Sequence, residues 1–137
     1  MFYLIYISSA SRPMSDGDLR ELLEKSREKN TALGITGMLL FQIGSFMQLL
    51  EGEESVVQML FERIRQDERH YAVIPIITGI AAHRNFDNWS MGFCNLDRPG
   101  DFQRYEQYIR ENLILRDFQE DTRHAYEFMV MFSDTRR

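Results

Sequence analysis

Polar residues interrupt the apolar stripes of two predicted helices at their inner ends. On the first helix Ser26 and Asn30 continue a stripe of leucines, and on the second helix Arg63 and Asp67 take the equivalent places. A buried polar group without a partner costs roughly 1 to 3 kcal/mol, so these side chains need hydrogen-bonding partners. Two helices that both turn polar therefore predict a shared ligand with hydrogen-bonding edges.

A tyrosine and a glutamine on the strands beneath these helices extend the candidate site. Tyr6 belongs to a run of β-branched and aromatic residues, and Gln48 belongs to a second apolar strand. A phenol is oxidised most easily when its proton has an acceptor, and a glutamine amide offers both a donor and an acceptor. The pair is therefore suited to rearranging hydrogen bonds beside a ligand.

Each of these residues also has a purely structural interpretation. A tyrosine in a strand commonly fills the core, and a lone glutamine commonly lies at an edge. Asn30 is also a signal for a helix end before Gly34. Arg63 and Asp67, four residues apart, also suit a surface ion pair worth about 0.2 to 0.5 kcal/mol. It is the joint placement of these residues that favours a functional site.

The elements that must position these residues follow from periodicity and turn signals. Ser15 and Asp18 form a start signal for the first helix, and Ser55 with Gln58 forms a capping box for the second. The acidic run at 51–54 is interpreted as solvated loop and helix start. The predicted strands cover residues 3–8, 35–41, 46–51, 73–81 and 89–96, with a hairpin turn at 42–45.

This order of elements predicts an α+β fold. It contains a ferredoxin-like βαββαβ core with an added fifth strand and two helices on one sheet face. Pro75 makes the fourth strand an edge strand or a bulge, because proline has no N–H to donate. The first and third strands are neighbours in this topology, so Tyr6 and Gln48 can meet under the helices.

The opposite face of the predicted sheet is too apolar to leave in water. Helical spacing recurs in the C-terminal part of the sequence, and we expect two C-terminal helices there to cover this face. The predicted division is therefore a ligand-binding domain over 1–97 and a helical extension over 98–137 that packs on the sheet.

Composition narrows the classes of protein. The chain has 137 residues and a net charge of −5, which argues against direct binding to nucleic acid. No apolar run is long enough for a membrane span, and the N-terminus lacks the pattern of a secretory signal. A single cysteine, Cys94, predicts a reducing cytoplasm. His70, His83 and His124 lack the spacing of metal ligands, so we expect no metal.

Several spaced motifs together resemble the BLUF family, the sensors of blue light using flavin. The resemblance covers roughly residues 2–96 and implies a flavin, FAD with FMN or riboflavin as alternatives, bound noncovalently between the two helices. The motifs are Leu4-Ile-Tyr-Ile-Ser8, Lys29-Asn30, Gly34-Ile-Thr-Gly-Met-Leu39, Phe46-Met-Gln-Leu-Leu-Glu-Gly52, Asp67-Glu-Arg-His70 and Asn88-Trp-Ser-Met91.

The resemblance implies photochemical roles for particular residues. Tyr6 matches the tyrosine that donates an electron and a proton to the excited flavin. Gln48 matches the glutamine that links this tyrosine to flavin N5 and O4, and which rotates or tautomerises after light. Trp89 and Met91 match switch residues on the fifth strand, which pass the signal outward.

The remaining matches concern flavin binding. Asn30 resembles the asparagine at the carbonyl edge of the ring, while Arg63 and Asp67 resemble residues near the ribityl and pyrimidine regions. Ser26 and Arg69 are further carry-overs. Lys29 departs from the asparagine or histidine frequent in the family, and it suits either a phosphate contact or a solvent-facing position.

The sequence thus predicts a short, stand-alone blue-light photoreceptor without enzymatic activity. Its lit state would act on a downstream signalling protein or on an interface between copies of the chain, and homo-oligomers are expected from the resemblance. The alternative is a light-independent module that binds another small ligand on the same scaffold. No G-x-G-x-x-G or phosphate-cradling loop supports an enzyme.

Overall fold

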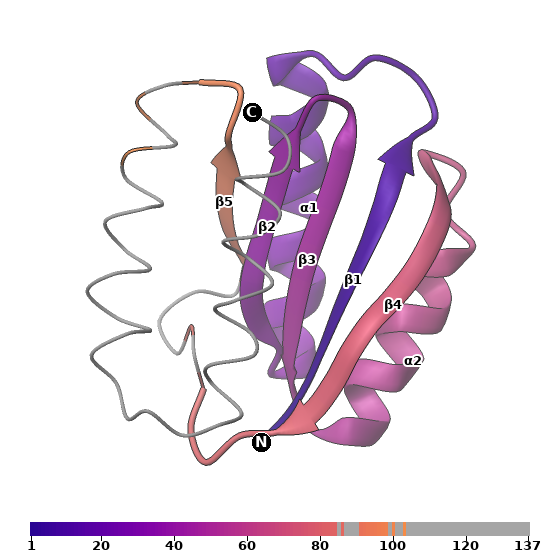
Figure 1. The fold of residues 1–137 in the computed structure, drawn as a ribbon. Coiled ribbons are helices and arrows are strands. Elements are labelled where there is room, and N and C mark those ends of the chain that lie inside the picture. The colour runs from indigo at the N-terminus through magenta and orange to yellow at the C-terminus, as the bar shows by residue number, and fades with distance from the viewer. Residues whose placement is uncertain (85, 87–90, 99, 101–102, 104–137) are drawn as a thin grey trace.

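The computed structural model describes residues 1–84, 86, 91–98, 100 and 103. Its strands form one sheet in the order β4-β1-β3-β2-β5, in which only the β2–β5 pair among the described strands is parallel (Figure 1). The ferredoxin-like core with an added fifth strand is therefore confirmed. The elements are β1 (Phe2–Ala10), α1 (Asp16–Leu33), β2 (Thr36–Gln42), β3 (Ser45–Gly52), α2 (Glu54–Arg65), β4 (His70–Ile80) and β5 (Gly92–Asn95).

Helix α1 begins and ends at the predicted signals. Ser15 Oγ accepts a hydrogen bond from the Asp18 N–H at 3.1 Å, and Asp18 Oδ2 accepts one from the Ser15 N–H at 3.0 Å. This reciprocal pair is a capping box that satisfies two backbone donors. The helix ends at Gly34, whose φ of 68° lies in the left-handed region that glycine adopts without strain.

Helix α2 begins earlier than the sequence pattern predicts. Its N-cap is Glu53, which makes no side-chain cap bond, and Ser55 donates instead to Glu53 Oε1 at 3.0 Å. The predicted Ser55–Gln58 capping box is therefore wrong, because Ser55 already lies within the first turn. The helix also ends at Arg65, so Asp67 lies in the following turn and not on the helix stripe.

The strand predictions need two corrections of extent. Strand β4 lies at the sheet edge, and Pro75 pairs with Tyr6 beside a register shift, as the missing donor predicts. It begins at His70, three residues earlier than expected. Strand β5 covers only Gly92–Asn95, so Met91 precedes the strand. Trp89, the other expected member of this strand, lies outside the described residues.

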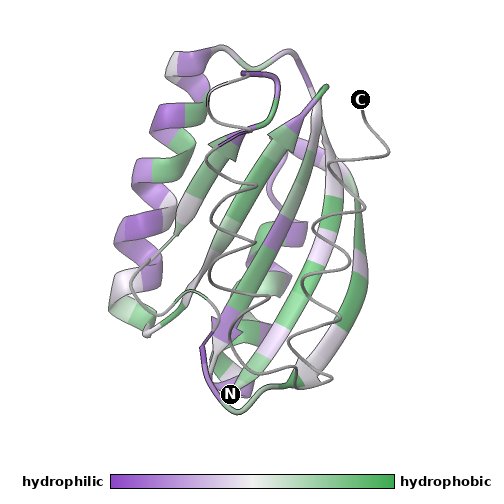
Figure 2. Cartoon of the chain, turned by 60° about the vertical axis from the view of Figure 1, so that its left-hand side comes forward, coloured by the Kyte–Doolittle hydropathy of each residue, from purple (hydrophilic) through white to green (hydrophobic). Residues whose placement is uncertain are grey.

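Two apolar clusters pack on opposite faces of the sheet. The first, here called the front cluster, lies on the sheet face that α1 and α2 cover, which is turned away from the viewer in Figure 1. It joins Leu4, Tyr6, Phe46 and Leu50 to apolar residues of both helices and confirms the predicted helix-covered face. The back cluster consists of buried hydrophobic residues that alternate with them along the strands. Figure 2 shows green, hydrophobic residues along much of each long strand, which agrees with burial on both faces. The two C-terminal helices predicted to cover this back face, and the extension over 98–137, lie almost entirely outside the described residues.

The carboxylate of Glu51 is buried at the end of β3 and joins three segments. Its Oε1 accepts hydrogen bonds from the Thr36 hydroxyl at 3.0 Å and from the Phe86 N–H at 2.6 Å. Arg84 donates to Thr36 Oγ1 at 2.8 Å and to the Gly34 carbonyl at 2.8 Å. A buried carboxylate needs such donors. The interpretation of position 51 as solvated is therefore wrong, and Glu51 ties the chain after β4 to the sheet.

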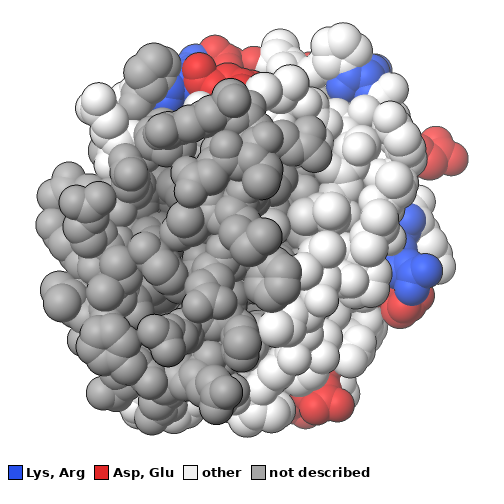
Figure 3. All heavy atoms as spheres, in the orientation of Figure 1, with Lys and Arg blue, Asp and Glu red and all other residues white. Residues whose placement is uncertain are grey.

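Charged side chains on the face shown in Figure 3 lie mainly near its rim. The described area between them shows neither acidic nor basic atoms (Figure 3).

Within the part of the chain that the structure describes, no helix combines the length and apolarity needed to cross a membrane.

Candidate functional site

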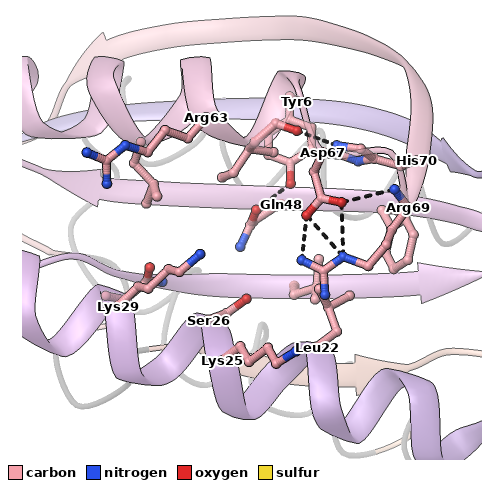
Figure 4. A pocket seen from close by; sticks show the side chains of 15 residues that line it. Tyr6, Leu22, Lys25, Ser26, Lys29, Gln48, Arg63, Asp67, Arg69 and His70 are labelled. Carbon is pink, nitrogen blue, oxygen red and sulfur yellow. Dashed lines mark hydrogen bonds and ion pairs between the residues drawn. The ribbon is translucent and has the colours of Figure 1, made fainter.

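A pocket lies between α1 and α2, above β1 and β3 (Figure 4). The space that it encloses, including its open mouth, amounts to about 810 Å³. The eight residues predicted to bind a ligand all line this pocket: Tyr6, Ser26, Lys29, Asn30, Gln48, Arg63, Asp67 and Arg69. The fold thus brings together residues from four elements and one turn, although their contact with a ligand stays a prediction.

Tyr6 and Gln48 form the floor of the pocket. They are directly paired across the antiparallel strands β1 and β3, which places both side chains on the front face. The Tyr6 hydroxyl donates a hydrogen bond to Gln48 Oε1, and both side chains are buried. Burial, together with the charge of Asp67, raises the pKa of the Tyr6 phenol well above its ordinary value. Tyr6 therefore stays protonated and keeps a proton to donate.

The amide of Gln48 also contacts Met91. Gln48 Nε2 donates to Met91 Sδ at 3.3 Å, and Met91 is buried immediately before β5. Methionine sulfur is a weak acceptor, so this contact orients the amide without holding it strongly. The structure thus joins Tyr6, Gln48 and Met91 in one chain of hydrogen bonds, while their roles in light sensing stay a prediction.

Asn30 lies in the last turn of α1 and also faces the pocket. Its backbone carbonyl accepts a hydrogen bond from the Ile35 N–H at 2.9 Å, which belongs to the end of α1. Its side chain is buried and lines the pocket. Ser26 lies one turn earlier on the same helix and lines the same wall.

Asp67 and Arg69 form an ion pair at one end of the pocket (Figure 4). Arg69 Nε lies 3.0 Å from each carboxylate oxygen of Asp67, and the Arg69 N–H donates to Oδ1 at 2.9 Å. Hydrogen bonds from the Arg69 side chain lower the pKa of Asp67 to about 2, so the carboxylate is charged at neutral pH. The alternative interpretation of Arg63 and Asp67 as a surface ion pair is therefore wrong, because the Asp67 carboxylate pairs with Arg69.

Lys29 and Arg63 extend from opposite helices at the other end of the pocket (Figure 4). Both residues are exposed, and neither forms an ion pair within the described residues. Their placement supplies positive charge beside the mouth of the pocket. Such charges can bind an anionic group, and the phosphate and solvent-facing interpretations of Lys29 both agree with this exposed position.

His70 lines the pocket, although the sequence analysis placed it only within a family motif and among histidines without metal-ligand spacing. Its Nε2 lies 2.6 Å from the Ile64 carbonyl oxygen and its Nδ1 lies 2.9 Å from Ser8 Oγ. A carbonyl oxygen can only accept, so Nε2 carries a proton; in the neutral ring Nδ1 then accepts from the Ser8 hydroxyl. The ring meets Tyr6 edge-on with centroids 6.3 Å apart. Its position in the sequence, directly after the predicted pocket residues Asp67 and Arg69, was the signal that could have identified it as a pocket residue. No cluster of three metal-ligating side chains occurs among the described residues.

Comparisons with known proteins agree on one family. A sequence model of the family described as sensors of blue-light using FAD, abbreviated BLUF, matches residues 1–92. The photoactivated adenylate cyclase subunit beta of Euglena longa is 44% identical over 73 residues, which are 53% of this chain and 8% of that protein. The chain therefore spans a small part of the curated relative's length.

Two solved structures have a closely similar fold. BlrP1 of Klebsiella pneumoniae, in a calcium and cyclic-diGMP complex, gives a TM-score of 0.83 at 30% identity and covers 97% of this chain and 34% of BlrP1. BlsA in its photo-activated state gives a TM-score of 0.69 at 30% identity and covers 91% of this chain and 90% of BlsA.

Proposed function

Since the chain belongs to the BLUF family of blue-light sensors that use FAD, we propose that its pocket between α1 and α2 holds a flavin whose excitation rearranges the hydrogen bonds of Tyr6 and Gln48. The observation that carries this proposal is the buried hydrogen bond from Tyr6 to Gln48 on the floor of the pocket. The pocket residues fit a planar ring with one polar edge.

The walls of the pocket suit the flat, largely apolar part of the ring. Leu22 lines it from α1, Leu60 and Ile64 from α2, and Leu39 from β2. Apolar walls with a few placed polar groups are typical of cofactor sites. Asn30 and the Asp67–Arg69 ion pair offer both hydrogen-bond donors and acceptors to the pyrimidine edge of the ring.

The positive end of the pocket favours a flavin that carries phosphate. Lys29 and Arg63 stand beside the mouth, where a ribityl chain that leaves the ring between the helices would emerge. An ammonium and a guanidinium are the usual partners of phosphate oxygens. We therefore assign the site to FAD, with FMN next and riboflavin, which has no phosphate, the least suited.

The proposed mechanism moves one electron and one proton out of Tyr6. When bound and excited, the flavin supplies an electron acceptor. Tyr6 gives up an electron, and its hydroxyl proton passes to Gln48 Oε1, which already accepts its hydrogen bond. When the electron returns, a proton returns to the Tyr6 oxygen. In a rotated amide this is the proton that Oε1 had accepted; in the tautomer Oε1 keeps that proton and one from Nε2 restores the phenol. The product is a new hydrogen-bond pattern, and no substrate is consumed.

The output of this change passes through Met91 in the proposed scheme. Gln48 Nε2 donates to Met91 Sδ in the arrangement seen here, so a turned amide would lose that bond. Met91 lies next to β5 at the sheet edge, from which a shift can reach Trp89 and a partner surface. We propose that the receiver is a separate signalling protein or another copy of this chain, in the cytoplasm, and that this chain is a sensor and not itself an enzyme.

A visible absorption spectrum before and after blue light tests the proposal. The chain purified with ample FAD should be yellow and should show a reversible red shift on illumination. Tyr6→Phe should keep the colour and lose the shift, because phenylalanine has no proton to give. Tyr71→Phe is the matched control, since Tyr71 is an exposed tyrosine on β4. A colourless protein would favour the light-independent binding module, and an intact shift in Tyr6→Phe would refute the mechanism.

A further inference from the structure

An arginine of α1 holds the backbone just before β5. Arg27 Nε donates to the Met91 carbonyl oxygen at 2.9 Å, although the two residues are 64 positions apart in the sequence. Arg27 follows Ser26 on the helix, and it does not belong to the residues that line the pocket. Its guanidinium therefore bonds to the backbone next to β5, whereas its helical neighbours Ser26, Lys29 and Asn30 line the pocket.

Whereas α1 contacts the backbone of Met91, the sheet contacts its side chain. It is buried, and its sulfur accepts from Gln48 Nε2 at 3.3 Å. Its methyl carbon packs over Gly37 of β2, where an added Cβ would lie 3.4 Å away from it. The carbonyl and the sulfur of the same residue are therefore both in defined contacts, one with α1 and one with β3.

The position of the Met91 sulfur influences which way the Gln48 amide faces. In the present arrangement the amide oxygen accepts from Tyr6, and the amide nitrogen donates to the sulfur. If the two ends of the amide were exchanged, the oxygen would meet a thioether that has no proton to donate. A sulfur held at this place therefore favours the arrangement seen here, and a displaced sulfur removes that preference.

We propose that Arg27 is a positioning residue of the photocycle: by holding the Met91 carbonyl, it keeps the sulfur beside the Gln48 amide and couples α1 to that amide. The inference rests on the proposed function and adds a route by which a change at Gln48 reaches the helix. Ser26 and Asn30 of the same helix line the pocket, so the flavin and the amide would act on one rigid element.

Recovery in the dark after illumination gives the first test. In Arg27→Ala loaded with FAD, the yellow colour and the red shift should persist, because Arg27 lies outside the pocket. Return to the dark spectrum should be slower by roughly two- to tenfold, the change expected for one lost hydrogen bond. Arg20→Ala is the control, since Arg20 is an exposed arginine of the same helix whose side chain forms no ion pair within the described residues.

A conservative variant separates the hydrogen bond from general effects of truncation. Arg27→Lys keeps a charged donor; its ammonium lies one bond farther along the side chain than Arg27 Nε, and the flexible stem can bend to bring it to the same carbonyl oxygen. Its recovery should lie close to that of the unchanged chain. If Arg27→Ala recovers like Arg20→Ala, or if Arg27→Lys is as slow as Arg27→Ala, the positioning role is refuted while the photoreceptor proposal stands.

A readout without light keeps the two proposals distinguishable. With methyl-labelled methionine, the NMR signal of Met91, assigned by Met91→Leu, should move in Arg27→Ala and stay in place in Arg20→Ala, in the dark. A shifted signal in a chain that shows no photocycle would support the Arg27–Met91 coupling and refute the photoreceptor function. An unmoved signal would overturn the inference whatever the spectra show.

Discussion

A double-mutant cycle on Tyr6 and Gln48 tests the central contact of the site. Both residues are nearly inaccessible, at 3% and 4% exposure, and the phenol hydroxyl donates to the amide oxygen between β1 and β3. The cycle compares the unchanged chain with Tyr6→Phe, Gln48→Leu and the double variant. All four keep similar side-chain volumes, so cavity effects are small.

The expected energies follow from what each change leaves behind. Gln48→Leu strands the buried Tyr6 hydroxyl without its acceptor, which costs about 1 to 3 kcal/mol of unfolding free energy. Tyr6→Phe leaves the Gln48 oxygen without its donor at a similar cost. The double variant removes both polar partners together and replaces them by apolar groups, which is close to neutral. It should therefore be more stable than either single variant, and the coupling energy should equal the two single costs together, about 2 to 6 kcal/mol.

Urea unfolding in the dark at fixed, saturating FAD measures these energies. Each variant's FAD affinity must be determined as well, because a ligand that binds only the folded state adds RT ln(1 + [L]/Kd) to stability. Energies that add within about 0.5 kcal/mol would show that the two side chains do not interact, and the reasoning about the pocket floor would fail.

Two further predictions concern the sheet and the charged end of the pocket. A Cβ on Gly37 would lie 1.9 Å from the Leu49 carbonyl oxygen, so Gly37→Ala should destabilise the fold by about 1 to 3 kcal/mol in urea unfolding. At Gly17 on α1 an added Cβ would meet only Ser15 Oγ, at an ordinary contact distance of 3.7 Å, so Gly17→Ala should instead stabilise the fold by about 0.5 to 1 kcal/mol; equal effects would contradict this contrast. Arg69 lowers the pKa of Asp67 to about 2 in the folded state. The ion pair therefore adds to the free energy of unfolding above about pH 4, and this contribution is lost as the pH falls toward 2. The stability difference between the unchanged chain and Asp67→Asn, measured by unfolding between pH 7 and pH 2, should be constant and then shrink; a constant difference throughout would refute the pairing.

Local signals in the sequence were sufficient for much of the fold. The Ser15–Asp18 capping box, the helix end before Gly34 and the edge position of the strand with Pro75 each depend on a few adjacent residues, and the structure confirms all three. Alternation within two strands was enough to place Tyr6 and Gln48 on one face, because successive side chains of a strand point to opposite sides.

Predictions failed where two local signals competed. The Ser55–Gln58 pattern was a plausible cap, yet α2 begins at Glu54 because packing of its apolar face decides the first turn. Arg63 and Asp67 had the spacing of a helical ion pair. The helix ends before Asp67, so the nearer Arg69 takes the carboxylate in the turn.

By itself, the sequence determined the element order, the polar inner ends of the helices and the residues that could meet in a pocket. Only the tertiary structure decided which hydrogen bonds these side chains make: His70 with Ser8, Glu51 with the Phe86 N–H, and Arg27 with the Met91 carbonyl. Each joins segments far apart in the chain. Periodicity describes neighbours a few residues away, whereas the partner of a buried polar group depends on how the elements pack in three dimensions.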